Sequence, residues 1–133
     1  MRFFAARCGD INVDVGLLEG GGLRGESRRV PSMCFVVEHA EGAVVWDTSM
    51  HPAVCADPVG YWGPLAEQIS VPEYRPDQTL PRRLDLLGIA PEAVRFILNS
   101  HLHNDHCGMN RFFPEATVRI ALTNSKSTTR FVT

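Results

Sequence analysis

Three histidines and an aspartate lie within six residues of one another, at His101, His103, Asp105 and His106. On a helix, side chains two residues apart point to nearly opposite sides, so His101 and His103 could not converge there. In an extended segment, alternate side chains share one side, which brings residues 101, 103 and 105 together. His106 can join them if the chain turns into a helix at that point. The spacing therefore predicts four potential ligands around one point.

Imidazole nitrogens and carboxylate oxygens bind Zn²⁺ in proteins, and they also suit Fe or Mn. Structural zinc sites usually contain cysteine ligands, so this donor set indicates a catalytic metal. Such an ion lowers the pKa of bound water to about 7 and so generates hydroxide at neutral pH. Two ions about 3.5–4 Å apart could hold this nucleophile and polarise a carbonyl or phosphoryl oxygen together. The alternative, a chance run of surface histidines, fits the alternating spacing poorly.

Two predicted strands end beside this chemistry. Residues 94–98 form a largely apolar run that is typical of an inner strand, and the histidine cluster follows its carboxyl end. Residues 33–38 and 43–46 predict a hairpin, whose second strand runs into Asp47. In layered α/β folds, functional sites commonly lie beyond the carboxyl ends of strands. The cluster therefore has the position expected of a functional site.

The clearest helix is predicted over residues 79–88, where leucines recur at i, i+4 and i+7. Thr79 is expected to cap its start and Gly88 to end it, and Leu86 is expected to widen its apolar stripe.

Strands and helices alternate along the rest of the chain, which favours an α/β layered architecture. Further strands are expected over 11–17 and 117–122, and a short helix over 108–113. A glycine-rich loop is expected over 19–25. Five prolines punctuate residues 52–76, which predicts mostly loop with a short helical piece near 65–69.

Composition limits the class of protein. The 133 residues suit one small domain, and 44% hydrophobic with 21% charged residues fits neither a disordered nor a membrane protein. A net charge of -2 gives no strong field for nucleic acid or an anionic membrane. The apolar run near Met1 is too short for a signal peptide or a membrane span. The four cysteines form no Cys-x-x-Cys pair, so we expect reduced thiols and a cytoplasmic protein.

His101-x-His103-x-Asp105-His106 resembles the signature of the metallo-β-lactamase superfamily. Residues 31–122 resemble its lactonase-like branch, the N-acyl-homoserine lactonases and their relatives. Within this stretch, residues 44–52 are similar to the Asp-Thr-Gly segment of that branch, with Ser49 where glycine is usual.

The resemblance implies an αββα sandwich with a dinuclear metal site, most simply two Zn²⁺. His101 and His103 would bind the first metal, and Asp105 and His106 the second. Asp105 would also accept a proton during turnover. Asp47 would steady one of the ligands by hydrogen bonding.

Members of the family supply further ligands downstream of the signature, but this sequence has no histidine after His106 and no acidic residue after Glu115. We therefore expect the N-terminal half of the sandwich, with a partial domain over 1–122 and an atypical Ser/Thr-rich tail over 123–133. A half-sandwich leaves an apolar sheet face or an unpaired edge exposed, so we expect the chain to be poorly stable or to associate with itself or with a complementary fragment.

The resemblance implies a hydrolase that opens a lactone or an ester, a small-molecule substrate, through metal-bound hydroxide. Met50, Tyr61 and Trp62 could border an acyl pocket, although core packing explains them as well. One alternative is a catalytically inactive remnant that binds one metal weakly through His101 and His103. Another is a nuclease or an oxidoreductase built on the same site, and the absence of Lys/Arg clusters weakens the nuclease version.

Overall fold

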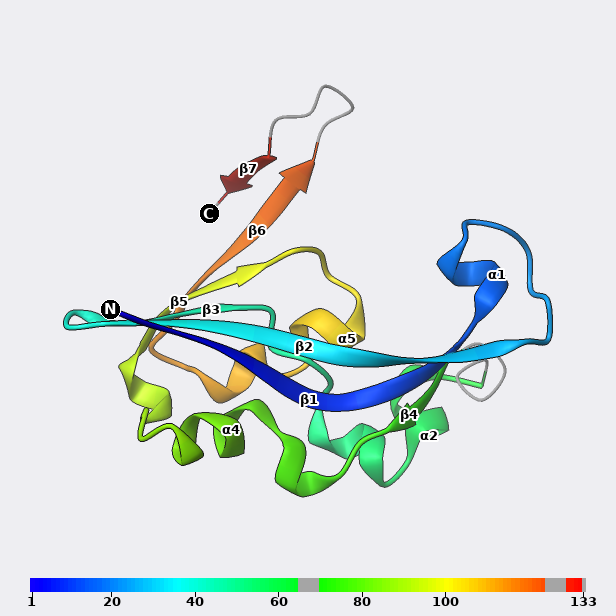
Figure 1. The fold of residues 1–133 in the computed structure, drawn as a ribbon, viewed down its shortest axis with the longest axis horizontal. Coiled ribbons are helices and arrows are strands. Elements are labelled where there is room, and N and C mark those ends of the chain that lie inside the picture. The colour runs from blue at the N-terminus through cyan, green and yellow to red at the C-terminus, as the bar shows by residue number, and fades with distance from the viewer. Residues whose placement is uncertain (65–69, 124–128, 133) are drawn as a thin grey trace.

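A computed structural model describes residues 1–64, 70–123 and 129–132. Its described strands form one mixed sheet in the order β4-β1-β2-β3-β5-β6-β7 (Figure 1). The strands are β1 (Arg2–Asp14), β2 (Ser27–His39), β3 (Gly42–Trp46), β4 (Ser70–Glu73), β5 (Val94–Asn99), β6 (Thr117–Thr123) and β7 (Thr129–Val132). The α/β architecture is as the sequence predicts.

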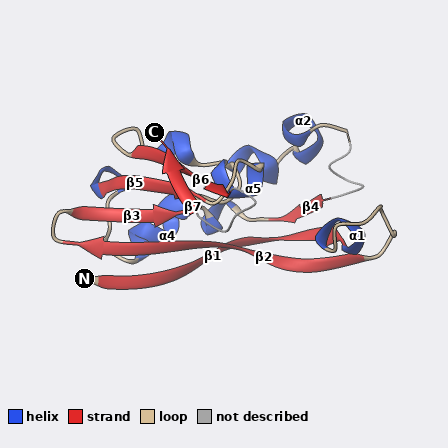
Figure 2. Cartoon of the chain, turned by 90° about the horizontal axis from the view of Figure 1, so that it is seen from above, coloured by secondary structure: helices blue, strands red, loops and turns tan. Residues whose placement is uncertain are grey.

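The centre of the sheet places two strand ends side by side. The hairpin of β2 and β3 is confirmed, and β3 pairs in parallel with β5, which pairs in parallel with β6. Figure 2 shows β1, β2, β3 and β5 running alongside one another. Because β3 and β5 point the same way, the residues that follow them emerge at one edge of the sheet. These residues include Asp47 and His101.

One face of the sheet packs on helices. Figure 1 shows α4 (Leu80–Leu86) and α2 (Pro58–Trp62) on the same side of β1 and β2. Leu80 and Leu84 of α4 are fully buried and join the strand residues of the core. The predicted helix is therefore confirmed, but two of its details are wrong. Leu86 is 76% exposed, and Thr79 occupies the N-cap position without a side-chain capping bond.

The opposite face of the central strands is apolar and open. Phe3 is 66% exposed, and its ring stacks on that of Phe35 with centroids 6.0 Å apart. A shallow hollow of about 350 Å³ lies on this face. It is lined by Phe3, Phe35, Val37, Val44, Trp46 and Leu98. We call these six residues the open apolar face. It is the kind of surface that the sequence leads us to expect on a half-sandwich.

The structure corrects several element boundaries. The first strand begins at Arg2 and stops at Asp14, where the short helix α1 (Val15–Leu18) starts, instead of covering 11–17. The helix expected over 108–113 is only a 3-10 turn (Asn110–Phe112), and the short helix α5 (Asn104–Cys107) precedes it. The segment expected to be mostly loop also contains α2 and β4, and the helical piece near 65–69 lies outside the described residues.

Short 3-10 helices connect several of these elements. They cover Pro52–Cys55, Pro76–Gln78 and Pro91–Ala93. Among the described residues, no helix is both long and apolar enough to span a membrane.

The glycine-rich loop is closed at its base by one carboxylate. Asp14 is buried, and its carboxylate accepts hydrogen bonds from the backbone N–H groups of Gly16, Arg24 and Gly25, at 2.8–3.2 Å. These bonds outweigh burial and lower the pKa of Asp14, with the bond from Arg24 contributing most. The loop therefore has a fixed entry and exit.

A buried carboxylate also marks a bulge in β1. The register with β2 shifts between Arg7 and Asp10, and Gly9 within the shift has φ +86. Asp10 is 2% exposed and accepts hydrogen bonds from the guanidinium groups of Arg7, at 2.8 Å, and Arg29, at 2.6 Å. The bond from Arg7 contributes most to the lowered pKa of Asp10.

Asp10→Asn is expected to destabilise the fold at neutral pH, because the charge-assisted hydrogen bonds from two guanidinium groups lose their anion. The native pKa of Asp10 is lowered relative to about 3.9 in the unfolded chain. Its contribution to stability is therefore full above pH 4 and is lost as pH falls through the lower, native value. Urea unfolding between pH 2.5 and 7 measures this. A stability difference between wild type and variant that did not shrink in acid would contradict it.

The open apolar face is expected to make the purified chain self-associate. Phe35→Asp should reduce both the concentration-dependent sedimentation and the binding of the dye ANS. Leu86→Asp is the matched control, because Leu86 is also exposed but lies on α4, against the other face of the sheet. A monomeric wild-type chain that melts cooperatively, or equal effects of the two variants, would count against this expectation.

Candidate metal centre

The chain after β5 has no regular secondary structure from Ser100 to His103 and then turns into α5. His103 is the N-cap residue of α5, with φ −69 and ψ 148, so the helix begins one residue later. This geometry brings three imidazole rings together, as the spacing predicts. The ring centroid of His101 lies 4.5 Å from that of His103 and 4.0 Å from that of His106.

His106 lies between two carboxylates. Its Nδ1 is 2.8 Å from Oδ2 of Asp47, and its Nε2 is 3.2 Å from Oδ2 of Asp105. The hydrogen bond with Asp105 and then that with Asp47 raise the pKa of His106 to about 9. His101 behaves in the opposite way, because burial and the neighbouring imidazoles lower its pKa. The cluster therefore combines a charged His106 with a neutral His101 at pH 7.

Asp47 holds the ends of both central strands. Its Oδ1 accepts from the backbone N–H of Ser100 at 2.8 Å, and its Oδ2 accepts from the Ser100 hydroxyl at 2.8 Å. Burial alone would raise the pKa of Asp47, but hydrogen bonds from His106 and Ser100 outweigh it and lower the pKa. Asp47 thus remains a carboxylate that orients His106 and secures the chain after β5. The pKa of Asp105 is lowered in the same way: burial raises it, but the hydrogen bond with His106 outweighs burial.

The loop after β3 is bonded to α5 through the main chain. Thr48 N–H donates to the carbonyl of His106 at 2.7 Å, and Gly108 N–H donates to the carbonyl of Ser49 at 2.8 Å. A Cβ on Gly108 would lie only 2.4 Å from the backbone N of His51, so glycine permits this close approach. The two segments therefore pack as one unit.

The buried amide of Asn99 and the partly buried amide of Asn110 complete this unit. The Asn99 amide donates to the carbonyl of His106 at 3.1 Å, and the Asn110 amide donates to the Asn99 oxygen at 2.7 Å. The Thr48 hydroxyl donates to the Asn110 oxygen at 2.8 Å. Sequence reasoning gave Asn99 no role, because its contact is defined only once the strands are placed.

The donor types fit a Zn²⁺-class ion, but the side chains are paired with one another. Within the described ranges, no group of three or more His, Cys, Asp or Glu side chains is arranged to hold a metal ion. The close packing of His101, His103 and His106 supplies the imidazoles, whereas the nitrogens of His106 face Asp47 and Asp105. An ion that bound here would have to separate His106 from Asp105.

The residues considered for an acyl pocket separate into two groups. Met50 is fully buried in the core and Trp62 packs against it, so core packing accounts for both. Tyr61 is 43% exposed and stacks on His51, with ring centroids 4.7 Å apart. The ring centroid of His51 also lies 5.5 Å from that of Phe112, so His51 is half-buried between aromatic rings.

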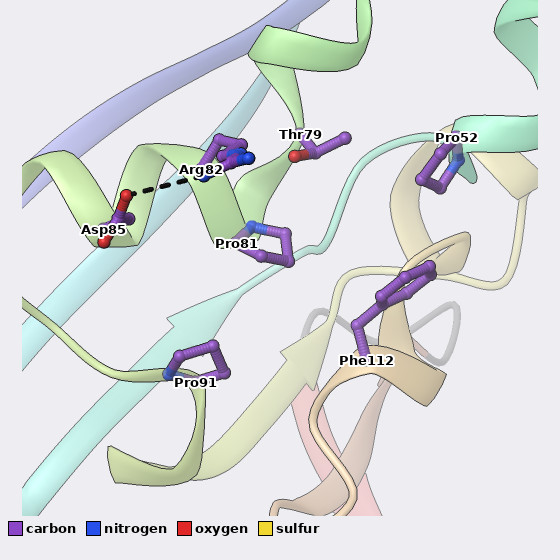
Figure 3. Close-up of a pocket in the computed structure, with 7 residues that line it drawn as sticks. All are labelled: Pro52, Thr79, Pro81, Arg82, Asp85, Pro91 and Phe112. Atoms are coloured by element: carbon purple, nitrogen blue, oxygen red, sulfur yellow. Dashed lines mark ion pairs between the residues drawn. The ribbon is translucent and has the colours of Figure 1, made fainter.

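A separate groove of about 420 Å³ adjoins this aromatic group on the helical side (Figure 3). It is lined by Pro52, Thr79, Pro81, Arg82, Asp85, Pro91 and Phe112. Arg82 and Asp85 form an ion pair across 3.8 Å at its edge. None of these lining residues belongs to the histidine cluster, so the groove is a different surface.

Curated relatives with similar sequences are lactonases. The chain is 29% identical over 117 residues to the N-acyl homoserine lactonase AttM of Azorhizobium caulinodans, which covers 88% of this chain and 44% of that protein. It is 33% identical over 85 residues to the N-acyl homoserine lactonase AiiB of Agrobacterium fabrum, over 63% of this chain and 30% of that protein. The chain thus spans less than half the length of these relatives.

The fold is also that of solved lactonases. An N-acyl homoserine lactone hydrolase with the product N-hexanoyl-L-homoserine bound at its catalytic metal center has a TM-score of 0.77 at 23% identity, over 87% of this chain and 46% of that one. Such a match confirms the fold, the N-terminal portion of a metallo-β-lactamase sandwich. The model of the metallo-beta-lactamase superfamily matches residues 27–118, which is well over half of the sequence. The chain therefore belongs to the metallo-beta-lactamase superfamily.

Proposed function

We propose that this chain is part of a metal-dependent hydrolase that opens a small-molecule lactone or ester, with an N-acyl homoserine lactone as the first candidate. The main observation in favour of this proposal is the cluster of three imidazoles and two carboxylates beyond β3 and β5. Relatives named as N-acyl homoserine lactonases support the substrate class.

His101, His103, Asp105 and His106 would hold the metal, with zinc favoured and Fe or Mn as alternatives. Two ions are proposed for a complete site, and a structural neighbour described as a dizinc lactonase, AidC, supports this at a TM-score of 0.51. When bound, such ions polarise a carbonyl oxygen and lower the pKa of water.

The chain's own residues prepare the site in a defined way. Asp47 accepts the hydrogen on Nδ1 of His106, so Nε2 would be the ligand atom after it gives up the proton of the charged imidazole. In this proposal, Asp105 would hold the metal in place of its contact with His106 and would accept a proton during turnover. The hydrogen bonds from His106 and then from Ser100 lower the pKa of Asp47 and keep it ionised.

The setting of the protein is part of the proposal. All four cysteines are free, and Cys8 and Cys34 are fully buried, which supports a reducing, cytoplasmic location. We propose a small-molecule substrate, no nucleic acid or membrane partner, and self-association through the open apolar face. We also propose that residues 1–122 form a partial domain and that residues 123–133 are an atypical tail. Strand β7 of this tail pairs with β6.

A second candidate is a catalytically inactive protein that binds one metal weakly through His101 and His103. The pairing of His106 with both carboxylates favours it, because a metal must compete with those bonds. Elemental analysis of the purified chain separates the two candidates. About two ions per chain support the hydrolase, and one weakly held ion supports the second candidate.

His103→Ala is expected to remove bound zinc and to reduce lactone hydrolysis to background, because an imidazole ligand is lost. Zinc content and turnover of an N-acyl homoserine lactone measure this. His39→Ala is the matched control, since His39 is the exposed last residue of β2. Zinc content that is equal in both variants and the wild type would refute the proposed ligand.

Asp47→Asn is expected to weaken metal binding by about 10- to 100-fold, the usual cost of losing a partner behind a metal-bound histidine. An amide cannot accept from both Ser100 and His106 with the strength of a carboxylate. Titration with Co²⁺ followed by absorbance measures the affinity. Asp85→Asn, on the surface of α4, serves as the control. An affinity within twofold of wild type would contradict the role given to Asp47.

A further inference from the structure

Two serine hydroxyls connect the first strand to the segment that carries Asp105. Ser32 on β2 and Ser49 in the loop after β3 are both buried, and their Oγ atoms lie 2.8 Å apart. The Ser49 Oγ is also 3.0 Å from the carbonyl oxygen of Cys8, and the Ser32 Oγ is 3.2 Å from the carbonyl oxygen of Asp105. The four groups form a line from the bulge of β1 to α5.

The two outer carbonyls lie where the strand ladder does not use them. Cys8 falls within the register shift of β1 and has no paired residue on β2. Asp105 lies in the first turn of α5. Ser49, at φ +62, has a backbone conformation that glycine adopts more readily, but glycine would lack the hydroxyl. Serine at this position therefore contributes a group that the usual residue cannot.

The line has three contacts but only two hydrogens, since each hydroxyl carries one. In one arrangement Ser49 donates to Ser32, and Ser32 donates to the Asp105 carbonyl. In another, Ser32 donates to Ser49, and Ser49 donates to the Cys8 carbonyl. If both hydrogens point outward, the two oxygens face each other at 2.8 Å without a bond. If the two hydroxyls keep a hydrogen bond to each other, only one of the carbonyls of Cys8 and Asp105 can therefore receive a hydrogen.

We propose that Ser32 is a positioning residue for Asp105, and that Ser49 competes with the Asp105 carbonyl for the hydrogen of Ser32. A held carbonyl steadies the first turn of α5, in which the N–H groups of His106 and Cys107 donate to the carbonyl of His103. The consequence for metal binding rests on the proposed function, in which Asp105 and His106 are ligands.

The test is amide hydrogen exchange of the metal-free chain, followed by NMR. In Ser32→Ala, the amides of His106 and Cys107 should exchange about 3- to 10-fold faster, the factor that corresponds to one ordinary hydrogen bond. In Ser49→Ala they should exchange no faster than in wild type, because the hydrogen of Ser32 becomes wholly available to Asp105. Both variants lose a buried hydrogen bond, so general destabilisation would affect them alike.

Three further measurements complete the design. Ser32→Thr keeps the hydroxyl and should keep the wild-type exchange rates. Thr79→Ala removes a buried hydroxyl at the start of α4 and should leave α5 unchanged. Co²⁺ affinity should fall about 3- to 10-fold in Ser32→Ala but not in Ser49→Ala.

Equal exchange at His106 in the two alanine variants, whether fast or slow, would overturn the proposal. Failure of the wild-type chain to bind Co²⁺ would instead overturn the proposed function. The role of Ser32 would be unaffected by that result, because the exchange rates of the metal-free chain test it separately.

Discussion

The arrangement beyond the sheet depends on the carboxylate of Asp47. It accepts three hydrogen bonds, two from Ser100 and one from His106, and it is 4% exposed. A buried anion with this many donors is costly to disturb, because each donor would lose a strong partner. The chain after β3, the chain after β5 and α5 are therefore held at one point. The imidazole cluster has its geometry because this point is fixed.

The sheet makes this point possible. The parallel pairing of β3 and β5 delivers Asp47 and Ser100 to the same edge, and α4 supports the strands from the helical side. Behind the cluster, Thr48, Asn99 and Asn110 satisfy one another and the carbonyl of His106. A fully bonded polar network of this kind favours a single arrangement over alternatives. The hydrogen bonds behind the cluster are thus complete, whereas the proposed metal ligands are still paired with one another.

The sequence predicted the parts whose signal is local. The apolar run of β5, the hairpin and the leucine spacing of α4 each specify an element within a few residues, and the alternating histidines predict their own convergence. β4 was not predicted because Pro72 indicates a loop, yet proline is tolerated there since β4 is an edge strand. The exposure of Leu86 and the contacts of Asn99 and Ser32 depend on neighbours distant in the chain. Periodicity carries no information about such neighbours.

The connection between β1 and β2 has a consequence of a different kind. Asp14 binds both ends of the glycine-rich loop, and the N–H of Val15 donates to the carbonyl of Glu26 at 2.7 Å. The register of the two long strands is thus set at the base of the loop, independently of its tip. Gly22 has open space where a side chain would be. The tip can therefore vary in length and composition during evolution while the strands beneath it keep their alignment.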